Sequence, residues 1–136
     1  MSGVTHTFKT SVTVPGLPAM PADPAVVVTA DSAVEYEVDV PAGTTVTMAI
    51  PTITKTDIYS MILNADKAAL NVTTNDPSGQ LFALAKNASV FWHNQLNVDL
   101  FPNPISTSTI TEFIIANPGT VNAVFRCSFL LNIATT

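Results

Sequence analysis

The side chains that could do covalent or metal chemistry are few in this chain and stand apart from one another. His6 and His93 are its two histidines, and neither has a second histidine or a carboxylate at the spacing of a metal site. The single cysteine, Cys127, excludes an internal disulfide and a zinc site made of cysteines. Neither a G-x-S-x-G motif nor a glycine-rich phosphate loop is present. We therefore expect no catalytic residue, no metal and no cofactor, and the protein is predicted not to be an enzyme.

The places of these residues in the sequence indicate structural roles instead. His6 lies on the apolar face of a predicted strand, 5–14, where a packed and hydrogen-bonded histidine is the simplest interpretation. Cys127 falls between two phenylalanines on the predicted inward face of the last strand, which indicates a buried, inert thiol. His93 follows Trp92 and precedes polar residues, so this pair is predicted to lie at a surface or an interface.

Acidic residues gather at Asp31, Glu35, Glu37 and Asp39. The last three alternate with apolar residues in VEYEVDV, so they fall on one face of one strand, about 7 Å apart at each step. Calcium is usually enclosed by a loop, whereas charges along an edge strand discourage aggregation. The pattern favours a solvated edge strand, and a calcium or subunit-bridging role is the alternative.

The composition predicts one globular domain with a surface poor in charge. Of the 136 residues, 47% are hydrophobic and only 11% are charged, against about 25% in typical soluble domains. The sequence contains no run of about 18 apolar residues, the length that a membrane-spanning helix needs. The net charge of -5 and five scattered basic residues argue against a nucleic-acid partner. Because surfaces with so little charge are often covered by partner chains, we expect a homo-oligomer.

Period-two alternation of apolar and polar residues predicts strands at 5–14, 34–40 and 121–133. Between the predicted strands lie turn signals rich in proline, glycine and asparagine, about every ten residues. Such spacing predicts an all-β fold, an antiparallel β-sandwich of jelly-roll-like type. We divide the chain into residues 1–25, a first strand with a proline-rich N-terminal arm, and residues 26–136, the β-sandwich domain.

Two predicted strands, 56–65 and 109–117, are apolar on both faces. A strand has that pattern when it is central in a sheet or when another subunit packs over it. On the second alternative, Tyr59, Met61 and Phe113 are interface residues. Trp92 and His93 then join them in the same predicted interface.

The segment VPGLPAMPADPA, residues 14–25, places Pro15, Pro18, Pro21 and Pro24 at every third position. Polyproline II has three residues per turn, so these prolines are predicted to line one edge of an extended segment. The segment is either an ordered crossover laid over the domain's own sheet or a stiff arm that carries the first strand onto a neighbouring subunit. On the second interpretation the four prolines are interface residues.

From about residue 58 onward, the order of segments resembles a group of small virion proteins of tailed bacteriophages. The resembling parts are IYSMIL, LNVTTNDPSG, LFALAKNASVFWHN, a Pro-Asn-Pro turn, TEFIIANPG and VNAVFRCSFLL. The opening THTFKTSVTVPGLP is also similar, and together these parts cover about two-thirds of the chain. The proline-spaced arm and the acidic VEYEVDV strand depart from the pattern of that group.

The resemblance implies a β-sandwich cement or decoration protein that has no active site and works through binding. It would act as an oligomer, with a trimer favoured, on the outer surface of the capsid in the virion, and its partner would be the major capsid protein. The alternative is a carbohydrate-binding or adhesive β-sandwich of a tail, baseplate or head fibre. For that alternative Trp92 is the strongest aromatic candidate.

Overall fold

The computed structural model describes residues 4–8, 26–30, 32–76, 81–94, 96, 100 and 102–132. For residues 4 and 26–30 it describes the backbone alone. The predicted proline-rich arm, with its four prolines, lies outside these ranges, as do residues 9–14 of the predicted first strand. Among the described residues there is no helix with the length and apolar character needed to cross a membrane.

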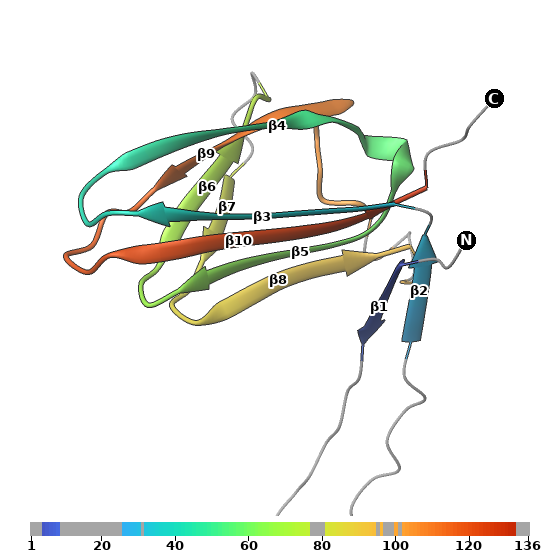
Figure 1. The fold of residues 1–136 in the computed structure, drawn as a ribbon, viewed down its shortest axis with the longest axis horizontal. Coiled ribbons are helices and arrows are strands. Elements are labelled where there is room, and N and C mark those ends of the chain that lie inside the picture. Colours follow the sequence, from blue (N-terminus) through green and yellow to red (C-terminus); the bar gives the residue numbers. More distant parts are fainter. Residues whose placement is uncertain are drawn as a thin grey trace, which may run out of the picture.

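Eight strands form two antiparallel four-stranded sheets that pack together (Figure 1). Sheet I has the order β3–β10–β5–β8, and sheet II has the order β4–β9–β6–β7. The strands of sheet I are β3 (Ser32–Val40), β10 (Ala123–Leu131), β5 (Ile58–Asp66) and β8 (Ala88–His93). Those of sheet II are β4 (Thr45–Thr54), β9 (Thr109–Ala116), β6 (Leu70–Thr74) and β7 (Leu81–Leu84), and a short 3-10 helix, η1 (Lys55–Asp57), joins β4 to β5.

Consecutive strands of this sandwich pass from one sheet to the other, except that β6 and β7 are neighbours in sheet II. This order is that of an eight-stranded jelly roll, in which two Greek keys close over one core. The predicted all-β antiparallel sandwich is therefore confirmed. The acidic strand β3 lies at the edge of sheet I, and its three carboxylates are exposed, as the alternation in VEYEVDV predicts.

The core lies between the two sheets, and a phenylalanine cluster joins them. Phe113 of β9 packs against Phe125 and Phe129 of β10, with ring centroids 5.5 and 6.0 Å apart. None of the three rings has exposed area. Each fully buried aromatic side chain contributes about 1.5–3 kcal/mol to folding, so this cluster is a principal tie between the sheets.

The two strands with apolar residues on both faces, β5 and β9, are both central strands of their sheets. Their inward side chains, Met61 and Phe113 among them, are fully buried in the core of this one chain. Their outward apolar side chains, Ile62 and Ile114, are half-buried between neighbouring strands. Central position is therefore enough to explain the pattern, and neither Met61 nor Phe113 has surface to offer a second chain.

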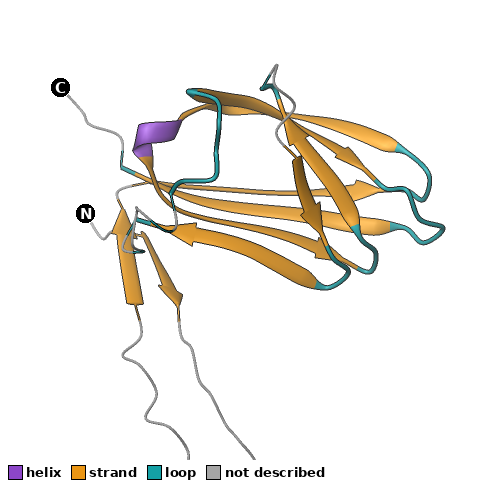
Figure 2. Cartoon of the chain, turned by 180° about the vertical axis from the view of Figure 1, so that it is seen from behind, coloured by secondary structure: helices purple, strands orange, loops and turns teal. Residues whose placement is uncertain are grey.

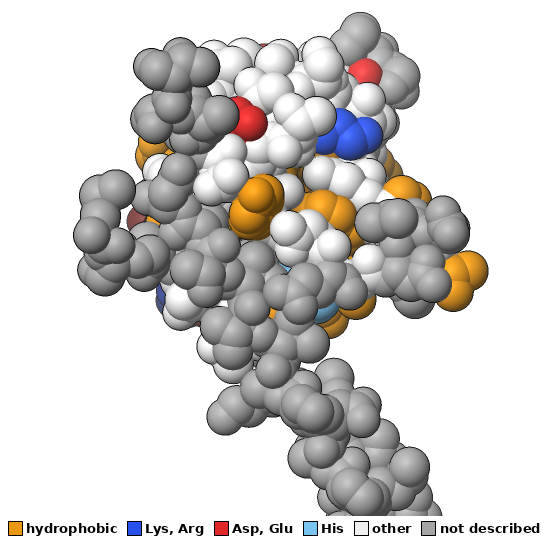
Figure 3. Space-filling model, turned by 90° about the vertical axis from the view of Figure 1, so that its right-hand side faces the viewer, with side chains coloured by type: hydrophobic (Ala, Val, Ile, Leu, Met, Phe, Trp, Pro, Cys, Tyr) orange, Lys and Arg blue, Asp and Glu red, His pale blue; other side chains and the backbone are white. Residues whose placement is uncertain are grey.

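A separate two-stranded antiparallel sheet lies at one end of the sandwich, and we call it the N-terminal ribbon (Figures 1 and 2). It consists of β1 (Val4–Phe8) and β2 (Val26–Ala30), with Val4 opposite Ala30 and Phe8 opposite Val26. In the part of the chain that the structure describes, the ribbon has no strand ladder with either sheet. Thus the described part of the predicted first strand pairs with a strand of its own chain. Seen from this end, few of the described side chains are charged (Figure 3).

Candidate functional site

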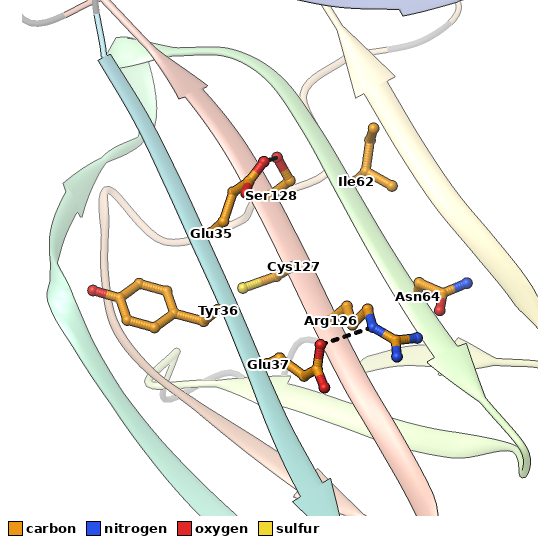
Figure 4. A pocket seen from close by; sticks show the side chains of 8 residues that line it. All are labelled: Glu35, Tyr36, Glu37, Ile62, Asn64, Arg126, Cys127 and Ser128. Carbon is orange, nitrogen blue, oxygen red and sulfur yellow. Dashed lines mark hydrogen bonds and ion pairs between the residues drawn. The ribbon is translucent and has the colours of Figure 1, made fainter. Parts of the chain in front are cut away.

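A hollow of about 420 Å³ lies on the outer face of sheet I, the face that points away from the core (Figure 4). Its outward-facing lining comes from three adjacent strands, β3, β10 and β5. These lining residues are Glu35, Glu37, Ile62, Asn64, Arg126 and Ser128. Strand register places them in two rows across the sheet, because Ser128 is opposite Glu35 and Ile62, while Arg126 is opposite Glu37 and Asn64.

Arg126 is the cation of this hollow and is held between two carboxylates. Its Nε donates to Glu37 Oε2 at 3.0 Å, and its Nη1 donates to Asp66 Oδ2 at 3.2 Å. The hydrogen bonds that Arg126 donates to Glu37 and Asp66 raise the pKa of Arg126. Because all three groups are substantially exposed, the ion pairs orient Arg126 more than they stabilise the fold. With Glu35 nearby the hollow remains acidic, which disfavours anionic ligands.

His6 of the N-terminal ribbon reaches the same face of sheet I with both ring nitrogens. Its Nδ1 is hydrogen-bonded to the Ser60 hydroxyl, and its Nε2 lies 2.9 Å from Ser128 Oγ. Ser128 in turn donates to Glu35 Oε1 at 3.4 Å. Burial lowers the pKa of His6, and the charge of Glu35 opposes that shift. The prediction of a packed, hydrogen-bonded histidine at this position is confirmed.

His93, at the end of β8, lies under the ribbon. The Phe8 ring is tilted over it with centroids 4.5 Å apart, and Phe8 also stacks on Phe91 at 5.2 Å. The side chain of His93 is only 4% exposed, and in the described ranges its buried Nδ1 has no hydrogen-bond partner. Desolvation by burial lowers the pKa of His93.

The hydroxyl and thiol groups near the hollow are not arranged as an activated nucleophile. The carboxylate of Glu35 accepts from Ser128 rather than from His6, so the order of a serine–histidine–acid triad is absent at this place. Burial raises the pKa of the Cys127 thiol to about 12, which leaves very little thiolate at neutral pH. Within the described ranges, no three or more histidine, cysteine or acidic side chains form a group able to hold a metal ion.

The predicted interface candidates that lie in the described part of the chain do not form one surface. Trp92 is 7% exposed and points inward beside Met61, and His93 is covered by Phe8, so neither is at the surface where the sequence placed it. Tyr59 is half-buried and packs against Leu130 under the ribbon. Pro15, Pro18, Pro21 and Pro24 lie outside the described residues, and their interface role stays a prediction.

The sequence did not single out the hollow, although one signal for it was present. Arg126 and Ser128 fall on the polar alternates of the last predicted strand. The strands that flank β10 in the sheet are far away in the sequence, with Glu37 and Asp66 as the partners of Arg126. Alternation therefore indicated a polar face, but it could not show which carboxylates would meet the guanidinium.

The outer face of sheet II differs sharply from that of sheet I because two complete rows across it are uncharged. Register places Thr47, Ile114, Thr73 and Leu81 in one row, and Thr45, Ala116, Asn71 and Ala83 in the next. All eight side chains are exposed or half-exposed, and Leu81 is 58% exposed. Glu112 is the one charged residue in the four strands of this sheet.

No protein-family model and no curated protein matches the chain. Among solved structures, a de novo designed double-stranded β-helix studied by NMR is similar at 18% identity, over 70% of this chain and 96% of the designed chain, with a TM-score of 0.37. A pilus protein of Bacillus endospore appendages, described as a family of disulfide-linked pili, is similar at 13% identity, over 74% of this chain and 90% of the other, with a TM-score of 0.37. Similarities of this size carry no argument about function.

Proposed function

We propose that this protein is a non-enzymatic structural protein of a tailed-bacteriophage virion that cements or decorates the capsid. In this proposal it acts as a homotrimer on the outer surface of the shell and binds the major capsid protein. The observation that carries the proposal is the outer face of sheet II, which is uncharged over two full rows of side chains. The jelly roll adds support by analogy, since this architecture recurs in viral capsid domains.

The distribution of charge over the two outer faces assigns them different roles. Sheet I carries Glu35, Glu37, Asp39, Asp66 and Arg126 toward solvent. Sheet II presents threonine, alanine, asparagine, isoleucine and leucine side chains instead. The buried centre of a protein interface is depleted in charged residues, because each charge there loses its hydration. Sheet II is therefore the face that suits a protein partner.

The size of this face favours several copies acting together. Four strands spaced about 4.8 Å apart, with two rows of side chains about 7 Å apart along each strand, give a patch of roughly 270 Å². A standard interface buries about 800 Å² on each partner. One copy thus offers about a third of the usual contact area, and a trimer would hold a shell through the combined binding of three such faces.

The experiment places a charge in the middle of sheet II. Thr47→Lys and Asn71→Lys alter exposed positions on β4 and β6, and Ser89→Lys is the matched control on the outer face of sheet I. Binding is measured by co-sedimentation with capsid shells that lack this protein, prepared from the phage that encodes it. Light scattering after size-exclusion chromatography gives the mass of each variant in solution.

We expect the unmodified protein to have a mass in solution three times that of one chain, which is 14.3 kDa, and to sediment with the shells. Both sheet II variants should bind at least tenfold more weakly, whereas Ser89→Lys should bind as the unmodified protein does. A protein that is monomeric in solution and does not bind the shells contradicts the proposal. Equal binding by all three variants contradicts the assignment of sheet II as the contact face.

A second candidate function is carbohydrate binding at the hollow of sheet I, and the position of Phe91 favours it. Phe91 is 50% exposed and lies opposite Ile62, which lines the hollow. An exposed ring at the border of a hollow that contains the Asn64 amide and the Arg126 guanidinium would combine the apolar and polar contacts that small-ligand sites use. Trp92, the aromatic candidate from the sequence, has too little exposed area for this role.

A glycan array distinguishes the two functions. Carbohydrate binding predicts a signal that is lost in Phe91→Ala and kept in Leu81→Ala, which removes a similarly exposed apolar side chain from sheet II. An array without signal, or a signal indifferent to Phe91→Ala, counts against this candidate.

A further inference from the structure

We propose that the N-terminal ribbon is an acid-released clasp, which holds the outer face of sheet I while His6 and His93 are neutral and leaves it when they take up protons. The proposal concerns the ribbon and the surface beneath it. It stands independently of any role in a virion.

The ribbon covers a row of side chains that would otherwise face solvent. Leu130, Ser60 and His93 lie side by side at outward positions of β10, β5 and β8. Leu130 and Ser60 have no exposed area, and His93 has 4%. Outward-facing side chains are buried only when something lies over them, and here Phe8 of the ribbon packs on Leu130 and on the His93 ring.

Both histidines of the chain are in this one contact. His6 comes from the ribbon and His93 from sheet I, and the Phe8 ring lies near both, with centroids 6.1 Å from His6 and 4.5 Å from His93. Because the contact contains no strand ladder, these side chains and their neighbours hold the ribbon in place. A change in the charge of the two rings therefore acts directly on the attachment.

The hydrogen bonds of His6 suit the neutral ring. Ser128 donates its proton to Glu35, so it must accept from His6 Nε2–H, and His6 Nδ1 is then left to accept from the Ser60 hydroxyl. A second proton on Nδ1 would turn the Ser60 hydroxyl away. Ser60 is fully buried, and in the described part of the chain His6 is its only side-chain hydrogen-bond partner, so that proton would lose its acceptor.

His93 suits a neutral ring for a different reason. Its Nδ1 is buried and meets no acceptor among the described residues. A proton added there would create a cation beneath the Phe8 ring without a hydrogen-bond partner. Such a cation recovers its hydration only when the ribbon moves away.

Among the described residues, the groups that surround the two rings are almost all uncharged. From β3, Glu35 is the one charged group acting on His6, and it favours protonation. β5 presents Ser60, and β10 presents Ser128 and Leu130, against which Tyr59 packs. From β8 the neighbour is Phe91, and β2, with the sequence VVVTA, has no titratable side chain. Burial outweighs Glu35, and the pKa of each histidine lies below its ordinary value of 6.5.

The sign of the pH effect follows from these lowered pKa values. The released state, with both rings in water, binds more protons below about pH 6.5 than the attached state does. Attachment is therefore complete above pH 6.5 and weakens as the pH falls toward the lowered values. The equilibrium constant for attachment falls by up to about tenfold per unit decrease in pH for each histidine that must take up a proton.

The test is an NMR titration of the full chain from pH 7.5 to 4.5, in which the Cε1–H signals report the histidines and backbone amides report the strands. We expect both histidines to titrate below pH 6.5, and the amides of β1 and β2 to move to unfolded positions over the same range. The amides of β3–β10 should keep their dispersed positions. Loss of the sandwich signals together with those of the ribbon overturns the proposal, as does a ribbon that stays attached after both histidines have titrated.

Variants that remove the titratable rings provide the control. His6→Gln keeps a donor and an acceptor between the two serines, and His93→Phe keeps an aromatic ring beneath Phe8. The double variant should hold its ribbon throughout the titration, and ribbon release in that variant overturns the proposal. In His93→Phe alone, ribbon attachment should depend on pH through the uptake of one proton instead of two. This single variant provides a second readout if the double variant does not fold.

Discussion

Phe8 and Val26 lie opposite each other in the ribbon, so residues 9–25 leave β1 and enter β2 at adjacent positions. An Asn-Gly turn joins antiparallel strands at such a place. We predict that replacing residues 9–25 by Asn-Gly preserves the ribbon and the sandwich. The shorter connection should stabilise the ribbon by about 1–2 kcal/mol, because less loop entropy is lost on closing it. Hydrogen exchange of the β1 and β2 amides measures the effect, and loss of their protection contradicts it.

The same variant decides the role of the four prolines. If Pro15, Pro18, Pro21 and Pro24 form part of an interface, the shortened chain should fold but lose its trimeric mass or its binding to shells. Deletion of residues 1–30 is the comparison, because it removes the ribbon as well. If the shortened chain assembles as the full chain does, the prolines take no part in assembly.

The Asn117 side chain binds three backbone groups and so joins the end of β3 to its own loop, at the end of the sandwich opposite the ribbon. Its Nδ2 donates to the carbonyls of Val40 and Val121 at 3.0 and 2.8 Å, and its Oδ1 accepts from the Gly119 amide at 3.0 Å. Because Asn117 is only 2% exposed, Asn117→Ala would leave these buried backbone groups unpaired. We predict a loss of about 2–4 kcal/mol in the free energy of unfolding, measured with urea.

Asn122→Ala is the matched control for this measurement. Asn122 lies in the same loop, and its Oδ1 also accepts a backbone hydrogen bond, from Ala42 at 3.0 Å. Because Asn122 is exposed, water can replace that bond, and the cost should stay below about 1 kcal/mol. Equal losses in the two variants would contradict the role assigned to the buried amide.

Alternation alone was enough to predict β3 and β10 and the burial of Cys127, because each of these depends on which face of a strand a residue occupies. The polar residues after His93 predict a surface or interface position for Trp92 and His93, but both side chains are buried within this one chain. Trp92 is an inward residue of β8, and His93 is an outward residue that Phe8 covers from a strand more than eighty positions earlier. Contacts between such distant segments depend on strand pairing and register, which local periodicity does not contain.

The candidate site was unpredictable for the same reason. Glu37, Asp66 and Arg126 belong to three strands whose order in sheet I follows from the jelly-roll topology. The pairing of β1 with β2 was likewise hidden, since seventeen positions separate their ends. The apolar pattern of β5 and β9 left open whether a sheet or a subunit covers them, and only the position of each strand in its sheet decided it.

Lys67 follows β5 with a φ of 75°, a left-handed conformation that costs a residue with a side chain about 1 kcal/mol relative to glycine. Its backbone N–H donates to Asn87 Oδ1 at 2.9 Å, and Asn87 is itself left-handed, with a φ of 56°. We predict that Lys67→Gly raises the free energy of unfolding by about 0.5–1 kcal/mol. Lys67→Ala removes the same charge but keeps the strain, so it should bring no gain.

Asn87→Ala should act in the opposite direction at this pair of turns. It removes the acceptor of the Lys67 amide and places a less tolerant residue in the left-handed region, so we predict a loss of about 1–2 kcal/mol. Urea unfolding of the three variants measures both effects. A gain in Lys67→Ala equal to that in Lys67→Gly would assign the effect to charge and contradict the argument from backbone strain.

Cys127 should be almost unreactive in the folded protein. With a pKa raised to about 12 by burial, about one thiol in ten thousand is ionised at pH 8, whereas about a quarter is ionised at an ordinary pKa of 8.5. Reaction with a disulfide reagent should therefore be at least about 1000-fold slower in buffer than in denaturing urea. Ser89→Cys, at an exposed position, in a Cys127→Ala background should react quickly in both conditions. Rapid labelling of native Cys127 would show that β10 opens without global unfolding, and would contradict the tight packing between the sheets.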